Sequence, residues 1–180
     1  MALAQRMIKM QESQTVALNS TLARLKREGK DIVALGAGEP DFDTPDFIKE
    51  AAIEAIRQGY TKYTPAEGSM ELREAIAGWL QEAYGAHYTP REIVVTAGAK
   101  YAVFQAILAV CDPGSEVILP QPYWVSYPEM IQLADATCRL IDPADRDHLK
   151  ISAAELKAAI NAKTRLVILN SPSNPSGAVY

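Results

Sequence analysis

The chain has 180 residues, of which 48% are hydrophobic and 22% are charged, and its formal net charge is -4. This composition is typical of a globular protein, and the slight acidic excess excludes a basic surface for nucleic acid. No run approaches the roughly 18 apolar residues of a membrane span, so we expect a cytoplasmic protein without a membrane partner. Cys111 and Cys138 fit no metal-binding or redox spacing and are interpreted as reduced core side chains.

The first third of the chain predicts two helices and a short strand. Leucines three and four residues apart predict a helix over 18–25. The apolar residues 32–35 predict a strand. A further helix is expected to start with Thr44 as its N-cap and Pro45 at its first position, and to end before Gly59.

The remaining chain alternates between helix and strand patterns. Apolar residues at spacings of three and four predict a helix from Ser69 to Gly85. Strands are expected over 93–96, 116–119, 137–141 and 165–169, and helices over 103–110, over 127–134 and after a capping box of Ser152 and Glu155. This alternation predicts an α/β fold, a three-layer α/β/α sandwich around a mainly parallel sheet.

A polar loop of sequence Asn-Ser-Pro-Ser-Asn-Pro-Ser-Gly (170–177) follows the last of these strands. Ligands bind at the carboxyl ends of strands in open α/β sheets. Prolines restrict the backbone around Asn174, and its amide offers both donors and an acceptor, which suits a phenolic oxygen beside a carboxylate. Taken alone, an ordinary turn without a ligand is the simpler interpretation.

Four motifs occur in one order along the chain. They are Gly-Ala-Gly-Glu-Pro-Asp-Phe-Asp-Thr-Pro (36–45), Lys-Tyr-Thr-Pro (62–65), Pro-Tyr-Trp-Val-Ser-Tyr-Pro (122–128) and Asn-Pro-Ser-Gly (174–177). Together they resemble the first half of a class I, fold type I, pyridoxal-phosphate-dependent aminotransferase, close to the bacterial aspartate/prephenate aminotransferases. The resemblance implies a homodimeric enzyme that uses pyridoxal 5'-phosphate to transfer an amino group between an amino acid of the aspartate or glutamate type and a 2-oxo acid.

The same resemblance implies a domain organisation. Residues 1–45 would form an amino-terminal arm and part of a small domain, and residues 46–180 the first part of the large cofactor-binding domain. Gly38 matches a position where the substrate carboxylate meets a backbone nitrogen. Ser13 and Thr15 match polar positions that contact the substrate side chain. The basic residue and proline common before that serine are replaced here by Gln-Glu (11–12), and an acid near a dicarboxylate site is unfavourable, so the choice among aspartate, prephenate and other substrates stays open.

Cofactor contacts are implied at two further places. Gly98, Ala99 and Lys100 stand at a strand-to-helix junction and match the positions that bind the cofactor phosphate, where amides and the helix dipole attract anions. Many relatives have Gly-Gly-Lys here, a difference that a main-chain contact at Ala99 tolerates. Lys100 is alternatively expected to recognise a distal substrate carboxylate. Tyr63 matches the tyrosine that reaches the cofactor phosphate of the neighbouring subunit.

Trp124 and Asn174 match the residues that contact the pyridine ring. Trp124 corresponds to the tryptophan that stacks on the ring, a task that suits a flat, rigid aromatic. Asn174 corresponds to the asparagine that bonds the ring hydroxyl and the substrate α-carboxylate. Without the resemblance, Trp124 would be interpreted as helix-sheet packing and residues 97–100 as a tight turn.

The resemblance also implies that the Schiff-base lysine, the acid that pairs with the pyridine nitrogen and the carboxylate-binding arginine lie beyond Tyr180, so that residues 1–180 contain no catalytic lysine. We therefore expect these residues by themselves to be inactive. Two alternatives are kept. One is another fold type I pyridoxal-phosphate enzyme, a lyase or synthase, because fold does not determine reaction. The other is a non-catalytic remnant that binds the cofactor or phosphate alone.

Overall fold

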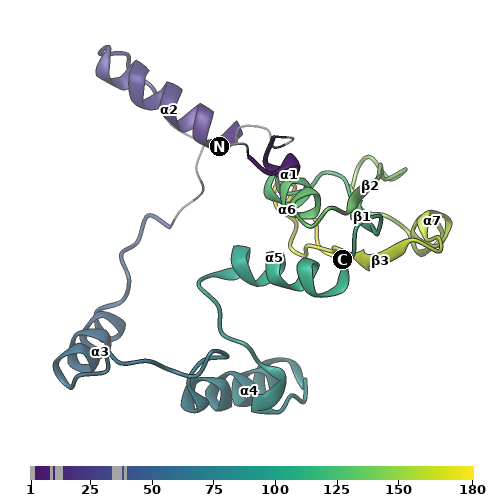
Figure 1. Cartoon of the computed structure of the whole chain (residues 1–180). Coiled ribbons are helices and arrows are strands. Elements are labelled where there is room, and N and C mark those ends of the chain that lie inside the picture. The colour runs from purple at the N-terminus through teal and green to yellow at the C-terminus, as the bar shows by residue number, and fades with distance from the viewer. Residues whose placement is uncertain (1–2, 9, 11–13, 34–37, 39) are drawn as a thin grey trace. The chain divides into compact units, whose positions relative to one another are not determined.

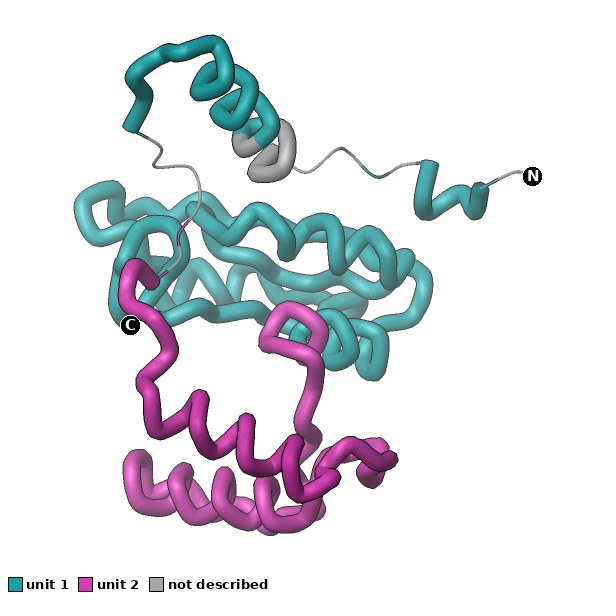
Figure 2. The backbone as a smooth tube through the Cα atoms, turned by 90° about the vertical axis from the view of Figure 1, so that its left-hand side faces the viewer, with its two compact units in different colours: residues 1–36, 103–180 teal, residues 37–102 magenta. Residues whose placement is uncertain are grey.

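The structure, a computed structural model, describes residues 3–8, 10, 14–33, 38 and 40–180 (Figure 1). The chain divides into two compact units: unit 1 comprises 1–36 and 103–180, and unit 2 comprises 37–102 (Figure 2). In chain order the elements are α1 (Gln5–Ile8), α2 (Gln14–Arg27), α3 (Asp46–Arg57), α4 (Met70–Tyr84), the 3₁₀ helix η1 (Pro90–Glu92), α5 (Ala99–Val110), β1 (Glu116–Pro120), α6 (Ser126–Leu133), β2 (Thr137–Ile141), α7 (Ala153–Ala159) and β3 (Thr164–Val167).

Unit 1 is built on a three-stranded parallel sheet in the order β2-β1-β3. The register pairs Glu116 with Thr137 along β2, and with Thr164 along β3. In the central strand β1, residues 117–119 are all fully or almost fully buried. Such a continuous apolar run is typical of a parallel strand that is covered on both faces. The predicted α/β class with a parallel sheet is therefore confirmed.

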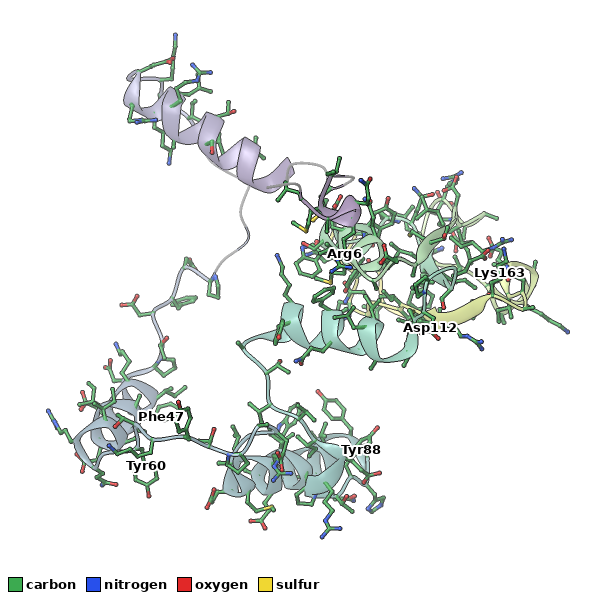
Figure 3. The ribbon with its side chains drawn as sticks, in the orientation of Figure 1. Arg6, Phe47, Tyr60, Tyr88, Asp112 and Lys163 are labelled. Atoms are coloured by element: carbon green, nitrogen blue, oxygen red, sulfur yellow. The ribbon has the colours of Figure 1, made fainter. Side chains whose placement is uncertain are left out.

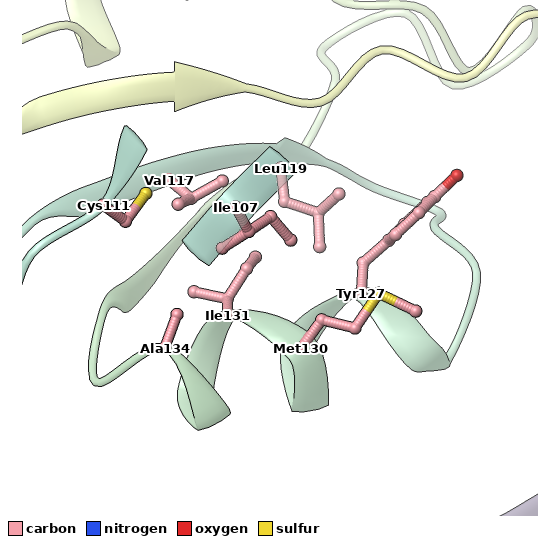
Figure 4. Close-up of a cluster of buried hydrophobic side chains, with 8 residues drawn as sticks. All are labelled: Ile107, Cys111, Val117, Leu119, Tyr127, Met130, Ile131 and Ala134. Atoms are coloured by element: carbon pink, nitrogen blue, oxygen red, sulfur yellow. The ribbon is translucent and has the colours of Figure 1, made fainter. Parts of the chain in front are cut away.

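Helices cover both faces of this sheet. Successive side chains of a strand point to opposite faces, and β1 follows this rule. Val117 and Leu119 pack in a cluster with buried side chains of α5, of α6 and of the residues that directly follow these helices, namely Ile107, Cys111, Tyr127, Met130, Ile131 and Ala134 (Figure 4). Ile118 instead packs in a second cluster with Ile141, Ile151 and Ala159 of α7. Unit 1 thus has the three layers that the sequence predicted.

Helix α7 begins with the predicted capping box. The Glu155 amide donates to Ser152 Oγ at 3.2 Å, and the Ser152 amide donates to Glu155 Oε2 at 2.7 Å. Glu155 Oε1 also accepts from the Ala144 amide at 2.8 Å. Hydrogen bonds from the Ser152 side chain and backbone, followed by that from Ala144, lower the pKa of the Glu155 carboxyl, because they favour its charged form.

Unit 2 contains α3, α4 and η1. Helix α4 begins at the predicted N-cap, where Ser69 Oγ accepts from the Leu72 amide at 3.3 Å. It ends at Gly85 in a left-handed conformation, as the sequence predicted. Helix α3 buries none of its residues, and the large side chains of Phe47 and Tyr60 are 75% and 79% exposed (Figure 3).

Three sequence predictions need correction. Residues 93–96 form no strand. The Val95 amide donates to the Glu67 carbonyl at 2.9 Å, but a strand requires a series of such backbone hydrogen bonds to a neighbouring strand. The N-cap of α3 is Pro45 and not Thr44, because Pro45 has an extended ψ of 141° that precedes the helix. Residues 32–33 belong to no strand, and residues 34–35 lie outside the described part of the chain. Within the described ranges, no helix is both long enough and apolar enough to cross a membrane.

Candidate functional site

The carboxyl ends of β1 and β3 lie side by side in unit 1, because the two strands pair in parallel. The pairing extends one residue beyond β3, where the Ile168 amide donates to the Ile118 carbonyl at 3.0 Å. A pocket at this edge is lined by both loops, by Gln121, Pro122 and Tyr123 after β1 and by Asn170, Ser173 and Tyr180 after β3. Two of the motifs singled out in the sequence therefore border one pocket.

Trp124 follows the pocket-lining Tyr123 and precedes α6. Its half-buried side chain packs against the hydrophobic cluster of Figure 4. Its ring lies edge-to-face with Tyr127, with the centroids 5.3 Å apart and the planes at 87°. Burial raises the pKa of the Tyr127 phenol. The indole is thus held by packing beside the loop that lines the pocket.

Asn174 follows the pocket-lining Ser173 in the loop after β3. Its backbone amide donates to the side-chain oxygen of Asn170 at 2.8 Å. The Asn174–Pro175 peptide bond is cis. The Asn174 side chain is exposed, and within the described chain its amide group makes no hydrogen bond. The backbone of Asn174 is therefore held from inside the loop, while its side chain can meet a ligand.

Gly98 lies in unit 2, directly before α5, with a φ of +92° that L side chains rarely adopt. Among the described atoms, none lies within 4 Å of the place that a Cβ would occupy, which leaves room beside this backbone. The Gly98 carbonyl accepts from Thr96 Oγ1 at 3.0 Å. Ala99 is the first residue of α5, a position whose amide has no acceptor within the helix. Lys100 follows in the same first turn and is exposed.

The other predicted contacts are distributed along the chain. Gly38 and Tyr63 belong to unit 2, and both are exposed, Tyr63 completely. Thr15 is described only as a backbone position within α2, and Ser13 lies outside the described residues. Within unit 1, the structure brings together the loops that carry Trp124 and Asn174.

Sequence reasoning missed Arg73, which is 4% exposed within α4. Its Nη1 donates to the Pro90 carbonyl at 3.0 Å, and its Nη2 lies 3.4 Å from Glu67 Oε1. Because the Glu67 carbonyl accepts from the Val95 amide, Arg73 ties the segment that leads to residues 96–100 to α4. The sequence feature that could have indicated its burial is its position beside Leu72, at the margin of the apolar face of α4.

The fold and this edge loop define a member of a known enzyme family. The chain belongs to the aminotransferase class I and II family, whose model matches residues 30–180. This confirms the resemblance carried by the four motifs.

Individual relatives agree with the family. An aspartate/prephenate aminotransferase from Nitrosomonas europaea is 48% identical over 180 residues, which cover 100% of this chain and 45% of that protein. A bifunctional aspartate aminotransferase and glutamate/aspartate-prephenate aminotransferase from Petunia hybrida is 49% identical, over 99% of this chain and 37% of that protein. The solved structure of aspartate aminotransferase from Thermus thermophilus with maleate has a TM-score of 0.96 and 45% identity, over 100% of this chain and 47% of that one. The chain thus spans less than half the length of these relatives.

Proposed function

We propose that this chain supplies the cofactor- and substrate-contacting residues of the amino-terminal half of a pyridoxal-phosphate-dependent aminotransferase. The observation that carries the proposal is the position of Asn174. It follows the carboxyl end of a parallel strand, and its side-chain amide makes no hydrogen bond within the described chain. Its neighbour Ser173 and the neighbour of Trp124, Tyr123, line one pocket at this edge. That edge is where ligands bind in open α/β sheets.

The residues present fit a phosphorylated aromatic cofactor. The open backbone at Gly98 and the helix start at Ala99 suit a phosphate, which needs amide donors and close approach. The Trp124 indole suits a flat heteroaromatic ring, and the Asn174 amide suits a ring oxygen. When bound, pyridoxal phosphate supplies an electron-withdrawing ring that makes the substrate α-proton acidic.

In the proposal, each contacting residue has a separate role. The Ala99 amide and the charge of Lys100 hold the phosphate, and Gly98 gives it room to approach, since the Gly98 amide itself donates to the Thr96 carbonyl at 2.8 Å. Trp124 orients the pyridine ring by contact with its face. The Asn174 side-chain amide donates a hydrogen bond to the ring oxygen and to the substrate α-carboxylate, and the Gly38 amide is a second donor to that carboxylate. None of these residues removes the α-proton.

The proposal extends to substrates and assembly. We assign an amino donor of the aspartate or glutamate type and a 2-oxo acid acceptor, supported by the relatives' names. Gln-Glu at 11–12 disfavours a dicarboxylate nearby, and for that reason prephenate and aspartate are to be tested separately. The complete exposure of Tyr63 supports a homodimer in which it contacts the neighbouring cofactor. Residues 1–45 and 46–180 are assigned to the arm with part of the small domain and to the large domain.

The test uses the purified whole protein. We expect it to bind pyridoxal phosphate and to transfer the amino group of aspartate or glutamate to oxo acids, measured by product formation. Asn174→Ala should lower kcat/KM by roughly 10- to 100-fold, because a hydrogen bond to a charged group contributes about 1.5–3 kcal/mol. Cofactor binding with elimination or condensation in place of amino transfer would refute the aminotransferase and support the lyase or synthase alternative.

A further inference from the structure

The loop that carries Asn174 is closed by hydrogen bonds of its own. The Ser173 amide donates to the Ala178 carbonyl at 2.8 Å, and the Gly177 amide donates to the Ser173 carbonyl at 2.7 Å. These bonds give the loop a defined internal shape. They do not by themselves orient it on the sheet, which requires contacts from outside the closed segment 173–178.

Asn170 provides one such contact. It stands two residues after Ile168, whose amide donates to the Ile118 carbonyl of β1, so one residue separates Asn170 from the strand pairing. Its Oδ1 accepts from the Asn174 amide at 2.8 Å. An N–H group can be met only by an acceptor, and the orientation of the Asn170 side-chain amide is therefore determined. Asn170 thus links Asn174 to the segment that leaves the sheet directly after β3.

Tyr180 provides the second contact, on the far side of the loop. Its amide donates to Ser171 Oγ at 3.0 Å, and its phenolic oxygen accepts from the Ile151 amide at 3.0 Å. Ile151 is 9% exposed and belongs to the hydrophobic cluster around α7. The end of the loop is thus attached to a packed part of unit 1 that is distant in sequence.

From these contacts we infer that Asn170 and Tyr180 are positioning residues that orient Asn174 toward its ligand. The inference rests on the proposed function, in which Asn174 contacts the cofactor. Both residues line the pocket between the β1 and β3 loops, and the functional group of each accepts a hydrogen bond from a backbone amide. They act on Asn174 through the backbone, and neither is assigned a role in chemistry.

The experiment compares Asn170→Ala and Tyr180→Phe in the whole protein with a matched control, Asn161→Ala. Asn161 precedes β3, at its amino end, and its Oδ1 accepts from the Lys163 amide at 2.8 Å, the same kind of side-chain-to-backbone bond. Its Nδ2 also donates to Glu116 Oε2 at 2.8 Å, so this control loses more hydrogen bonds than Asn170→Ala and is the stricter comparison. Asn170→Asp, which keeps an acceptor for the Asn174 amide, is the rescue variant. The measurements are amide hydrogen exchange of a peptide covering 170–180, the dissociation constant of pyridoxal phosphate, the pH midpoint of the bound cofactor's absorbance change, and kcat and KM.

We expect faster exchange in 170–180 and weaker cofactor binding, by about three- to tenfold, for Asn170→Ala and Tyr180→Phe, since each loses one hydrogen bond. The absorbance midpoint should move upward, because an amide that donates to a ring oxygen stabilises its deprotonated form. Asn170→Asp should restore the slow exchange, and Asn161→Ala should leave cofactor binding within about twofold of the unchanged protein.

Different results overturn different claims. If exchange in 170–180 is unchanged in both variants, or if the control weakens cofactor binding as much as they do, the positioning role is refuted. If exchange increases while cofactor binding and the absorbance midpoint stay unchanged, the loop is anchored but Asn174 does not depend on it, and the inference also fails. Failure of the unchanged protein to bind pyridoxal phosphate would refute the proposed function itself, whatever the exchange rates show.

Discussion

Gly68→Ala should destabilise the protein because two segments of unit 2 approach each other closely at this glycine. Gly68 has a φ of +101°, and an added Cβ would lie 2.7 Å from Val95 Cγ2 and 2.8 Å from Val95 Cβ. The contact cannot be relieved by rotating the Val95 side chain alone, since its Cβ is fixed by the backbone. The two segments would have to separate, which would stretch the bond of 2.9 Å from the Val95 amide to the Glu67 carbonyl.

The expected cost has two parts. A left-handed backbone costs an L residue roughly 1–2 kcal/mol. Overpacking typically adds about 1–3 kcal/mol. Together these give a loss of about 2–5 kcal/mol for Gly68→Ala. A displaced Val95 would also disturb residues 96–100, so weaker phosphate binding is expected.

Gly85→Ala is the control that separates the two parts. Gly85 has a φ of +64°, and among the described atoms none lies within 4 Å of the place where its Cβ would stand. It should therefore show the backbone cost without the clash. Urea denaturation of both variants, followed by circular dichroism, measures the difference, which we expect to be about 1–3 kcal/mol. Equal losses of stability in the two variants would refute the close-approach argument.

Three further predictions concern the acid, thiol and guanidinium groups. The hydrogen bonds that lower the pKa of the Glu155 carboxyl stabilise the folded chain at pH values above 4.5, the ordinary pKa of this group. This stabilisation is lost as the pH falls through the pKa that the carboxyl has in the folded chain. Glu155→Gln should therefore lower the melting temperature at about pH 7 and much less at about pH 3. Burial raises the pKa of the Cys138 thiol to about 11, so its alkylation at about pH 8 should be roughly 10-fold slower than that of an unfolded-chain cysteine, because the smaller thiolate fraction outweighs the higher nucleophilicity of that thiolate, and a fast native reaction, measured by mass spectrometry, would contradict this. Arg73→Met leaves the Pro90 carbonyl without its donor and should cost about 1–3 kcal/mol in urea denaturation, whereas an unchanged midpoint would mean that solvent replaces the guanidinium.

Much of the fold was predictable because its signals are local. The capping box of α7 and the N-cap of α4 were predicted from residues three positions apart, and both form as expected. The strand β2, Thr137–Ile141, has the predicted bounds. The four motifs indicated the family, which the match over 30–180 confirms.

The failed prediction of a strand over 93–96 has its physical origin in a partner distant along the chain. Residues 93–96 are as apolar as β1, yet the Val95 amide has a loop carbonyl as its partner and no strand forms. Whether a segment forms a strand depends on which segment lies beside it, and the amino-acid composition of the segment does not reveal that neighbour. The individual contacts of Gly98, Trp124 and Asn174 with a cofactor stay predictions.

From the sequence alone came the caps of α4 and α7, the α/β alternation and the family, since each depends on spacings within a few residues or on short motifs. Only the tertiary structure decided that Arg73 is buried against the Pro90 carbonyl, and that the Tyr180 hydroxyl meets the Ile151 amide. Those contacts join residues 17 and 29 positions apart. The Arg73 contact exists because packing removes water from the guanidinium, and a buried polar group must find a partner wherever the fold brings one. Tyr180 stays 49% exposed, and its contact depends on the fold bringing its hydroxyl to the Ile151 amide.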